Sequence, residues 1–363
     1  MTSATQCFAL PSPLKLRRGG QLWGAQLAYE TWGQLNAKAD NVVLLYTGMS
    51  PSAHAASNAD TSPGWWEDML GPGKPIDTQR WFVICANSLG SCKGSTGPDS
   101  INPQTGRAYR LSFPELSVED IALSTHALLE GLGIASVHVV IGASMGGMNA
   151  LAHIAQFPGH ARHAVFISTA ARAQPFAIAI RSLQRQLVIA DAHFAGGDYA
   201  DKREVNVGMG LARKLGVISY RSAEEWRTRF ARQRVEHPQT SGFGLEFEVE
   251  RYLQGHAERW AGSFDPCSYI YLSRAMDWFD LAEHGAGELE VALARAGLQR
   301  ALVIGVSSDI LFPLEQQAEL AQGLRQGGTQ VDFCPLASVQ GHDSFLVDMQ
   351  SFAPTVARFL ASV

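Results

Sequence analysis

Short apolar runs alternate with amphipathic segments along the first half of the chain. The runs at 41–47 and 81–86 are rich in Val, Leu and Ile and end in glycine or small polar residues, a pattern typical of buried strands. Strands that alternate with helices favour a parallel sheet with helices on both faces. The other strands predicted in this half are 137–141 and 163–168, and the helices are 117–132 and 145–157.

The pattern changes after Ala170, because no convincing buried strand follows between Gln174 and about Ala296. The sheet pattern returns at 299–306 and 331–335. An α/β fold is therefore predicted, with a core formed by residues 1–171 and 297–363 and a helical lid inserted at residues 172–296. The helices predicted in the insertion are 176–190, 207–215, 223–235, 246–260 and 266–279.

The N-terminal segment has a different character. Residues 1–11 are expected to form a loose arm, and Gly19-Gly20 between two strand-like runs predicts a hairpin.

Composition narrows the class of protein. The 363 residues are 46% hydrophobic and 17% charged with a net charge of −5, which is typical of a soluble globular protein and argues against nucleic acid as the main partner. No uncharged run reaches the roughly 18 residues of a membrane span, and no signal peptide is seen. The five cysteines show no C-x-x-C spacing, so we expect reduced thiols, a cytoplasmic location and no metal site.

The candidate chemistry starts at Ser144. Gly142-Ala143-Ser144-Met145-Gly146 follows an apolar strand and opens a helix-like run, which is the G-x-S-x-G pattern of a nucleophile elbow. The flanking glycines are expected to avoid clashes at this sharp turn. The helix that follows would point its first amides at the atom under attack.

Two further residues complete a candidate triad. Asp309 follows the predicted strand 299–306, and His342 lies in the loop after the last strand. The chain order Ser, Asp, His is that of an α/β-hydrolase, in which neutral His takes the serine proton and Asp orients the imidazole. The amides of Met145 and Met49 are the expected oxyanion donors. The competing residues are Asp332 and Asp348 for the acid, and His54 and His256 for the base.

With these residues in place, nearly the whole chain resembles the homoserine O-acyltransferase branch of the α/β-hydrolase superfamily. The resemblance implies acyl transfer from an acyl-CoA to the hydroxyl of an amino acid, no permanently bound cofactor and a homodimer formed through the lid. It also implies that Arg213, Tyr220 and Asp343 bind the amino acid, with Arg213 on its carboxylate and Asp343 attracting its ammonium group. The matching blocks are 27–33, 87–98, 142–151, 183–186, 212–214, 309–313 and 341–343.

Two features depart from the homoserine acetyltransferases and resemble the serine O-succinyltransferase-like subgroup. The loop Gly48-Met49-Ser50-Pro51 replaces an Ala-Leu-Thr-Gly type loop, and Arg181 stands where a neutral residue is usual. A changed loop beside the oxyanion donors could bring a shorter acceptor closer to the acyl group. A guanidinium at Arg181 could pair with the free carboxylate of a succinyl group, although a solvated lid residue or a contact to CoA phosphates would explain it too.

The resulting hypothesis is a ping-pong O-succinylation of L-serine by succinyl-CoA, whose product would serve cysteine biosynthesis. Three alternatives stay open: acetyl-CoA as the donor to serine, homoserine as the acceptor in methionine biosynthesis, and an esterase or thioesterase with the same triad. Arg213, Tyr220 and Asp343 facing Ser144 would favour transfer over hydrolysis.

Overall fold

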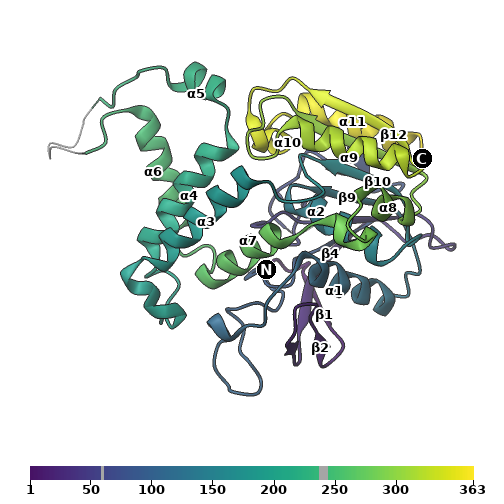
Figure 1. Cartoon of the computed structure of the whole chain (residues 1–363), viewed down its shortest axis with the longest axis horizontal. Coiled ribbons are helices and arrows are strands. Elements are labelled where there is room, and N and C mark those ends of the chain that lie inside the picture. Colours follow the sequence, from purple (N-terminus) through teal and green to yellow (C-terminus); the bar gives the residue numbers. More distant parts are fainter. Residues whose placement is uncertain (59–60, 237–243) are drawn as a thin grey trace.

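A computed structural model describes residues 1–58, 61–236 and 244–363, and an eight-stranded sheet forms its centre (Figure 1). The strand order is β1-β4-β8-β5-β9-β10-β11-β12. The neighbours from β8 to β12 pair in parallel, whereas β4 pairs antiparallel with β8 and with β1. The predicted mostly parallel sheet is confirmed. The strands are β1 Gln6–Ala9, β4 Gln26–Trp32, β5 Val42–Tyr46, β8 Phe82–Ala86, β9 Val137–Ala143, β10 Ala161–Ile167, β11 Arg300–Val306 and β12 Gln330–Leu336.

Helices cover both faces of the sheet, as the apolar strands predicted. Along β5, Leu44 and Tyr46 join the core cluster that includes α1 and α2, whereas Val43 and Leu45 join the cluster that includes α11. Because successive side chains of a strand point to opposite faces, a central strand covered on both sides is apolar throughout. The core helices are α1 Val118–Gly131, α2 Met145–Gln156, α8 Leu289–Arg295, α9 Leu314–Gln326, α10 Ser344–Val347 and α11 Met349–Ala361.

The segment between β10 and β11 begins with five helices, which Figure 1 draws in teal to green on one side of the sheet. Part of the predicted insertion, residues 237–243, lies outside the described residues, and so do residues 59–60. Within the described part of this segment all five expected helices are found, and the domain boundaries stay a prediction. The helices are α3 Pro175–Ile189, α4 Asn206–Tyr220, α5 Ala223–Phe230, α6 Glu248–Trp260 and α7 Pro266–Trp278.

The loose N-terminal arm is the prediction that the structure corrects. Residues Gln6–Ala9 form β1, which pairs antiparallel with β4 in the register Gln6 opposite Tyr29. An edge strand has only one hydrogen-bonded neighbour. Within β1 only Phe8 packs against the core, so the sequence of β1 contains no apolar run that would predict a strand. The hairpin around Gly19-Gly20 is confirmed. The small strands are β2 Leu14–Lys15, β3 Gln21–Leu22, β6 Leu70–Gly71 and β7 Ile76–Asp77.

Two simpler expectations can also be compared with the structure. In the described ranges, no helix combines the length and the apolar character that crossing a membrane requires. All five cysteines are free thiols.

Candidate active site

Ser144 occupies a strained turn between β9 and α2. Its backbone angles are φ 55° and ψ −125°, a conformation that a residue with a side chain rarely adopts. A Cβ on Gly142 would lie 2.1 Å from the carbonyl oxygen of Gly146, and a Cβ on Gly146 would lie 2.5 Å from that of Tyr46. The expectation that these glycines avoid clashes is confirmed. The Thr169 hydroxyl donates to the Ser144 carbonyl at 2.8 Å and helps to hold the turn.

A chain of hydrogen bonds links the three residues of the candidate triad. The Ser144 hydroxyl oxygen lies 2.8 Å from His342 Nε2, and His342 Nδ1 lies 2.7 Å from Asp309 Oδ2. The other carboxylate oxygen of Asp309 accepts the amides of Leu311 and Phe312, each at 2.9 Å. Asp309 therefore points at His342 with little rotational freedom, which is the geometry that a base-activated serine requires.

The protonation of His342 is controlled by its neighbours. Burial alone would lower the pKa of the imidazole, but the Asp309 carboxylate outweighs burial and raises that pKa above its usual value. Because a general base must be neutral, this arrangement favours Ser144 activation as the pH rises past the pKa of His342.

The two expected oxyanion donors lie beside the serine. Met145 is the first residue of α2, where backbone amides have no partner within the helix. Met49 lies in the loop after β5 and lines the same pocket as Ser144. Their positions suit the expected role, which stays a prediction.

One pocket gathers the predicted site residues from the core and from the insertion. Ser144 and His342 line it together with the loop residues Gly48, Met49, Ser50 and Pro51. The insertion contributes the candidate substrate residues from α3 and α4. Arg181 on α3 and Arg213 and Tyr220 on α4 line this pocket. Asp343, in the turn after β12, lines it as well.

Arg181 is a buried cation with unused donors. Its side chain is 6% exposed, and its Nε pairs with the Asp277 carboxylate of α7. Among the residues that the structure describes, neither terminal nitrogen of Arg181 has a hydrogen-bond partner. Asp277 also pairs with Arg185 at 2.7 Å. One carboxylate thus faces two guanidiniums, and a buried guanidinium without full compensation favours an anionic ligand.

Arg213 is positioned by an aromatic ring. Its guanidinium lies 4.7 Å from the ring centre of Trp260, which comes from α6. Burial raises the pKa of the nearby Tyr220 phenol, and the Arg213 charge opposes that rise, so the phenol stays protonated at neutral pH. A cation and a neutral hydroxyl therefore lie on the same wall of the pocket.

Asp343 has a protein partner that the sequence did not reveal. One of its oxygens lies 3.4 Å from Arg221 Nη2. Burial raises the pKa of the Asp343 carboxyl, and the Arg221 charge partly offsets that rise. Arg221, Asp277 and Trp260 are thus site residues that sequence reasoning missed, and no motif or spacing points to them.

The competing candidates have other partners. His54 pairs with Glu30, and His256 packs against Tyr252 on α6. Asp332 pairs with Arg300 at the surface, and Asp348 caps α11.

One histidine group offers nitrogens close enough together to suggest a metal. The candidate nitrogens of His126, His153 and His160 lie within 4.8 Å of one another. However, His153 Nε2 and His160 Nδ1 are 2.9 Å apart and hydrogen bonded, whereas two nitrogens at 2.0–2.1 Å from a tetrahedral ion would be about 3.3 Å apart. His153 Nδ1 is also bonded to the Tyr46 hydroxyl at 2.9 Å. The group is best described as a hydrogen-bonded pair of His153 and His160, with the His126 ring packed edge-on against both.

The chain is similar to known proteins over most or all of its length. Residues 19–344 match a family model described as the alpha/beta hydrolase fold. A serine O-succinyltransferase from Frateuria aurantia is 56% identical over 100% of both chains. A homoserine O-acetyltransferase structure from Bacillus anthracis superimposes with a TM-score of 0.89 at 27% identity, covering 98% of this chain and 97% of that one. The structure of esterase E22 gives 0.88 at 28% identity, covering 98% of this chain and 99% of that one.

Proposed function

This chain belongs to the α/β-hydrolase fold family, in its branch of homoserine and serine O-acyltransferases, and from that premise we propose that it transfers a succinyl group from succinyl-CoA to the hydroxyl of L-serine. The chain is an acyltransferase. The assignment of serine as the acceptor and of succinyl as the acyl group rests on the similarity to serine O-succinyltransferases and on the residues of the pocket.

The observation that carries the donor assignment is the pair of unpartnered nitrogens on Arg181, in the wall of the Ser144 pocket. A succinyl group ends in a free carboxylate, which a guanidinium can bind through two parallel hydrogen bonds. An acetyl group has no such carboxylate and would leave both terminal nitrogens of Arg181 without that partner. Arg213 supplies a second cation for the carboxylate of the amino acid, so the two cations correspond to the two carboxylates of the reaction.

The proposed reaction has two steps. Ser144 attacks the thioester carbonyl while His342 takes the hydroxyl proton, and the tetrahedral intermediate expels CoA, which receives that proton from the imidazolium. Serine then binds with its carboxylate on Arg213, and His342 removes the proton of its hydroxyl. The hydroxyl oxygen attacks the acyl-enzyme, O-succinyl-L-serine leaves, and Ser144 regains its proton.

The loop Gly48 to Pro51 supports serine as the acceptor. It lines the pocket on the side of the oxyanion donor Met49. Serine is one methylene shorter than homoserine, so its hydroxyl must come closer to the acyl carbon. A single methylene changes specificity only by about 10- to 200-fold, so we expect a preference rather than strict exclusion.

The test compares both donors with both acceptors by kcat/KM. We expect succinyl-CoA with serine to exceed the other three pairs. We also expect Arg181→Met to lower kcat/KM for succinyl-CoA by about 100-fold and to leave acetyl-CoA within a few-fold, because a charged hydrogen-bonded contact contributes about 1.5–3 kcal/mol. Arg185→Met is the matched control, since it also loses a pairing with Asp277 but lies outside the residues that line the Ser144 pocket.

Two results would contradict the proposal. A wild-type preference for acetyl-CoA, or equal losses with both donors in the Arg181 and Arg185 variants, would remove the succinyl assignment. A preference for homoserine would remove the argument from the loop.

The fold also serves esterases, so water is the competing acceptor. The insertion lies over Ser144, where exclusion of water would protect the acyl-enzyme. We expect acyl-CoA hydrolysis without an amino acid to be much slower than transfer. Faster hydrolysis than transfer would make the protein a thioesterase.

The product would carry a good leaving group on the β-carbon of serine, and displacement of succinate by sulfide would then yield cysteine. We propose this biosynthetic role together with a cytoplasmic location.

We also propose a homodimer formed through the insertion. Phe176 and Leu183 on α3, and Val207, Leu211 and Ile218 on α4, are between 43% and 61% exposed, which is unusual for large apolar side chains. The three residues on α4 fall on one side of that helix. Light scattering should give twice the chain mass, and Leu211→Glu should reduce it to one.

A further inference from the structure

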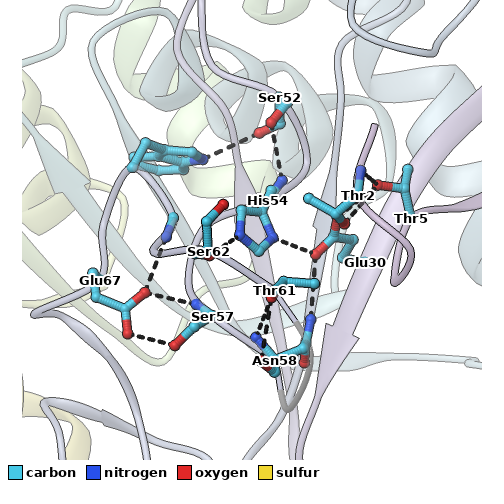
Figure 2. Close-up of polar contacts among 12 residues, drawn as sticks. Thr2, Thr5, Glu30, Ser52, His54, Ser57, Asn58, Thr61, Ser62 and Glu67 are labelled. Carbon is cyan, nitrogen blue, oxygen red and sulfur yellow. Dashed lines mark hydrogen bonds and ion pairs between the residues drawn. The ribbon is translucent and has the colours of Figure 1, made fainter.

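Met49 and its neighbours in the pocket lining lie in a long irregular loop between β5 and β6. In the described part of this loop, Gly48 to Pro51, Trp65 and Trp66 line the pocket, whereas His54 does not. An irregular segment of this kind keeps its position only if its polar groups are satisfied by specific partners. Figure 2 shows the buried polar network that supplies them.

Glu30 anchors this network on β4. Its side chain is fully buried, and one carboxylate oxygen accepts the hydroxyls of Thr2 at 2.6 Å and Thr5 at 2.7 Å. The other oxygen accepts His54 Nδ1 at 2.8 Å and Asn58 Nδ2 at 3.3 Å. Both oxygens of the Glu30 carboxyl group are thus used in hydrogen bonds, and one of them faces the loop.

His54 has an oxygen partner at each ring nitrogen. Its Nδ1 faces the Glu30 carboxylate, and its Nε2 lies 2.6 Å from the Ser62 carbonyl oxygen (Figure 2). Both neighbours only accept hydrogen bonds, so both ring nitrogens carry hydrogen. Burial alone would lower the pKa of His54, but the Glu30 carboxylate and the Ser62 carbonyl raise it above its usual value.

The ion pair is connected to the pocket wall through short contacts. The Trp65 indole donates to the Ser52 carbonyl at 3.1 Å, and the Trp65 amide donates to the His54 carbonyl at 3.3 Å. The Asn87 side chain donates to the Pro51 carbonyl at 3.1 Å. Movement of His54 would therefore displace Trp65 first and the segment with Met49 next.

We propose that His54 and Glu30 are positioning residues, whose buried ion pair places the Met49 amide and the Trp65 wall against Ser144 and thereby sets both turnover and acceptor affinity. This inference rests on the proposed function, in which Met49 is an oxyanion donor. Neither side chain touches the substrate. The pair acts through the loop, because it ties that loop to strand β4 of the sheet.

The test uses His54→Ala and Glu30→Gln, with Thr5→Val as the matched control. Glu30→Gln keeps the shape and removes the charge, so a neutral His54 could still be hydrogen bonded. Thr5→Val also removes a hydrogen bond to Glu30, but on the side away from the loop. Each variant is mixed with acyl-CoA in the absence of acceptor, and the amplitude and rate constant of CoA release are measured. KM for the amino acid is then determined.

For His54→Ala we expect a full amplitude of one CoA per active site, a rate constant lowered about 30-fold and a KM for the acceptor raised about 10-fold, since a displacement near 1 Å can cost up to about 100-fold. Glu30→Gln should show a smaller loss of the same kind, and Thr5→Val should resemble the wild type. If His54→Ala does not fold, Glu30→Gln decides the question.

A merely structural role predicts a different result. It would lower the amplitude, because fewer molecules are folded, and would leave the rate constant and KM unchanged, which would overturn the proposal. Kinetics within twofold of the wild type would overturn it as well. The assay uses whichever donor and acceptor the wild type prefers, so failure of the serine or succinyl assignment does not obscure the outcome.

Discussion

The sheet core and the helical insertion position their functional side chains in different ways. In the core, Ser144 follows β9 and Asp309 follows β11, and backbone groups orient both: the turn at Ser144, and two amides on the Asp309 carboxylate. In the insertion, Arg181 on α3 is oriented by Asp277 on α7, and Arg213 on α4 by Trp260 on α6.

This difference separates chemistry from selection. Acyl transfer needs the same nucleophile, base and oxyanion donors for every substrate, and the core holds these on rigid strand ends. In the proposed reaction, the carboxylates of the donor and the acceptor are bound by charges whose positions are set by packing between helices, whereas the core loop Gly48 to Pro51 affects the preferred length of the acceptor. Substitutions in the candidate triad should therefore lower turnover with all substrates, and substitutions of Arg181 and Arg213 should change affinity and preference.

The largest effect should come from Ser144→Ala. Removal of the nucleophile should lower kcat by about 10⁴- to 10⁶-fold with every donor and acceptor, as triad deletions do in serine hydrolases. Mass spectrometry should detect no acyl-enzyme. Ser219→Ala is the control, because Ser219 lines the same pocket and bonds only to its own helix, and it should stay within a few-fold. Retained transfer in the Ser144 variant would refute the covalent mechanism.

Asp309→Asn should follow, with kcat lowered about 10⁴-fold because an amide at this position favours the wrong histidine tautomer. Steady-state assays with both donors should give equal losses. Asp332→Asn is the matched control, since its partner Arg300 is remote from the pocket, and it should behave as the wild type. A fall in kcat with only one of the two donors would contradict the assignment of chemistry to the core and of substrate selection to the insertion.

Arg213→Gln should show the opposite signature. The acceptor carboxylate would lose its charged partner, so KM for the amino acid should rise by about 100-fold, while acyl-enzyme formation measured by CoA release stays near normal. Arg229→Gln removes a cation stacked on Tyr252 in the same insertion and should leave KM unchanged. A fall in the rate of CoA release would place Arg213 in the first step instead.

The smallest effect concerns pH. The pKa of His342 is raised above its ordinary value of 6.5, and the base must be neutral, so the acid limb of kcat/KM for acyl-CoA should lie above pH 6.5. Activity should fall about tenfold for each unit below that limb. Arg213→Gln should leave the acid limb at the same pH, because the limb reports the titration of His342, which belongs to the core. A limb below pH 6.5 would contradict the Asp309 contact as its cause.

Local signals in the sequence were sufficient for much of this molecule. The apolar runs predicted the central strands because strands buried on both faces must be apolar, and the glycines at 142 and 146 marked the elbow because only glycine fits there. By contrast, β1 was missed because an edge strand buries little, and α8 was missed because seven residues give a weak helical period. Asp277, Trp260 and Arg221 were missed because ordinary helices contain such residues everywhere.

The sequence by itself determined the α/β core, the elbow and the order of the candidate triad, since these depend on backbone sterics, apolar periodicity and the shared edge of parallel strands. Only the tertiary structure decided which charges are buried and how they are matched. It left Arg181 with free donors in the pocket and joined Glu30 to His54 across 24 residues of chain. The physical reason is that desolvation and pairing of a charge depend on neighbours brought together by folding, which no local pattern encodes.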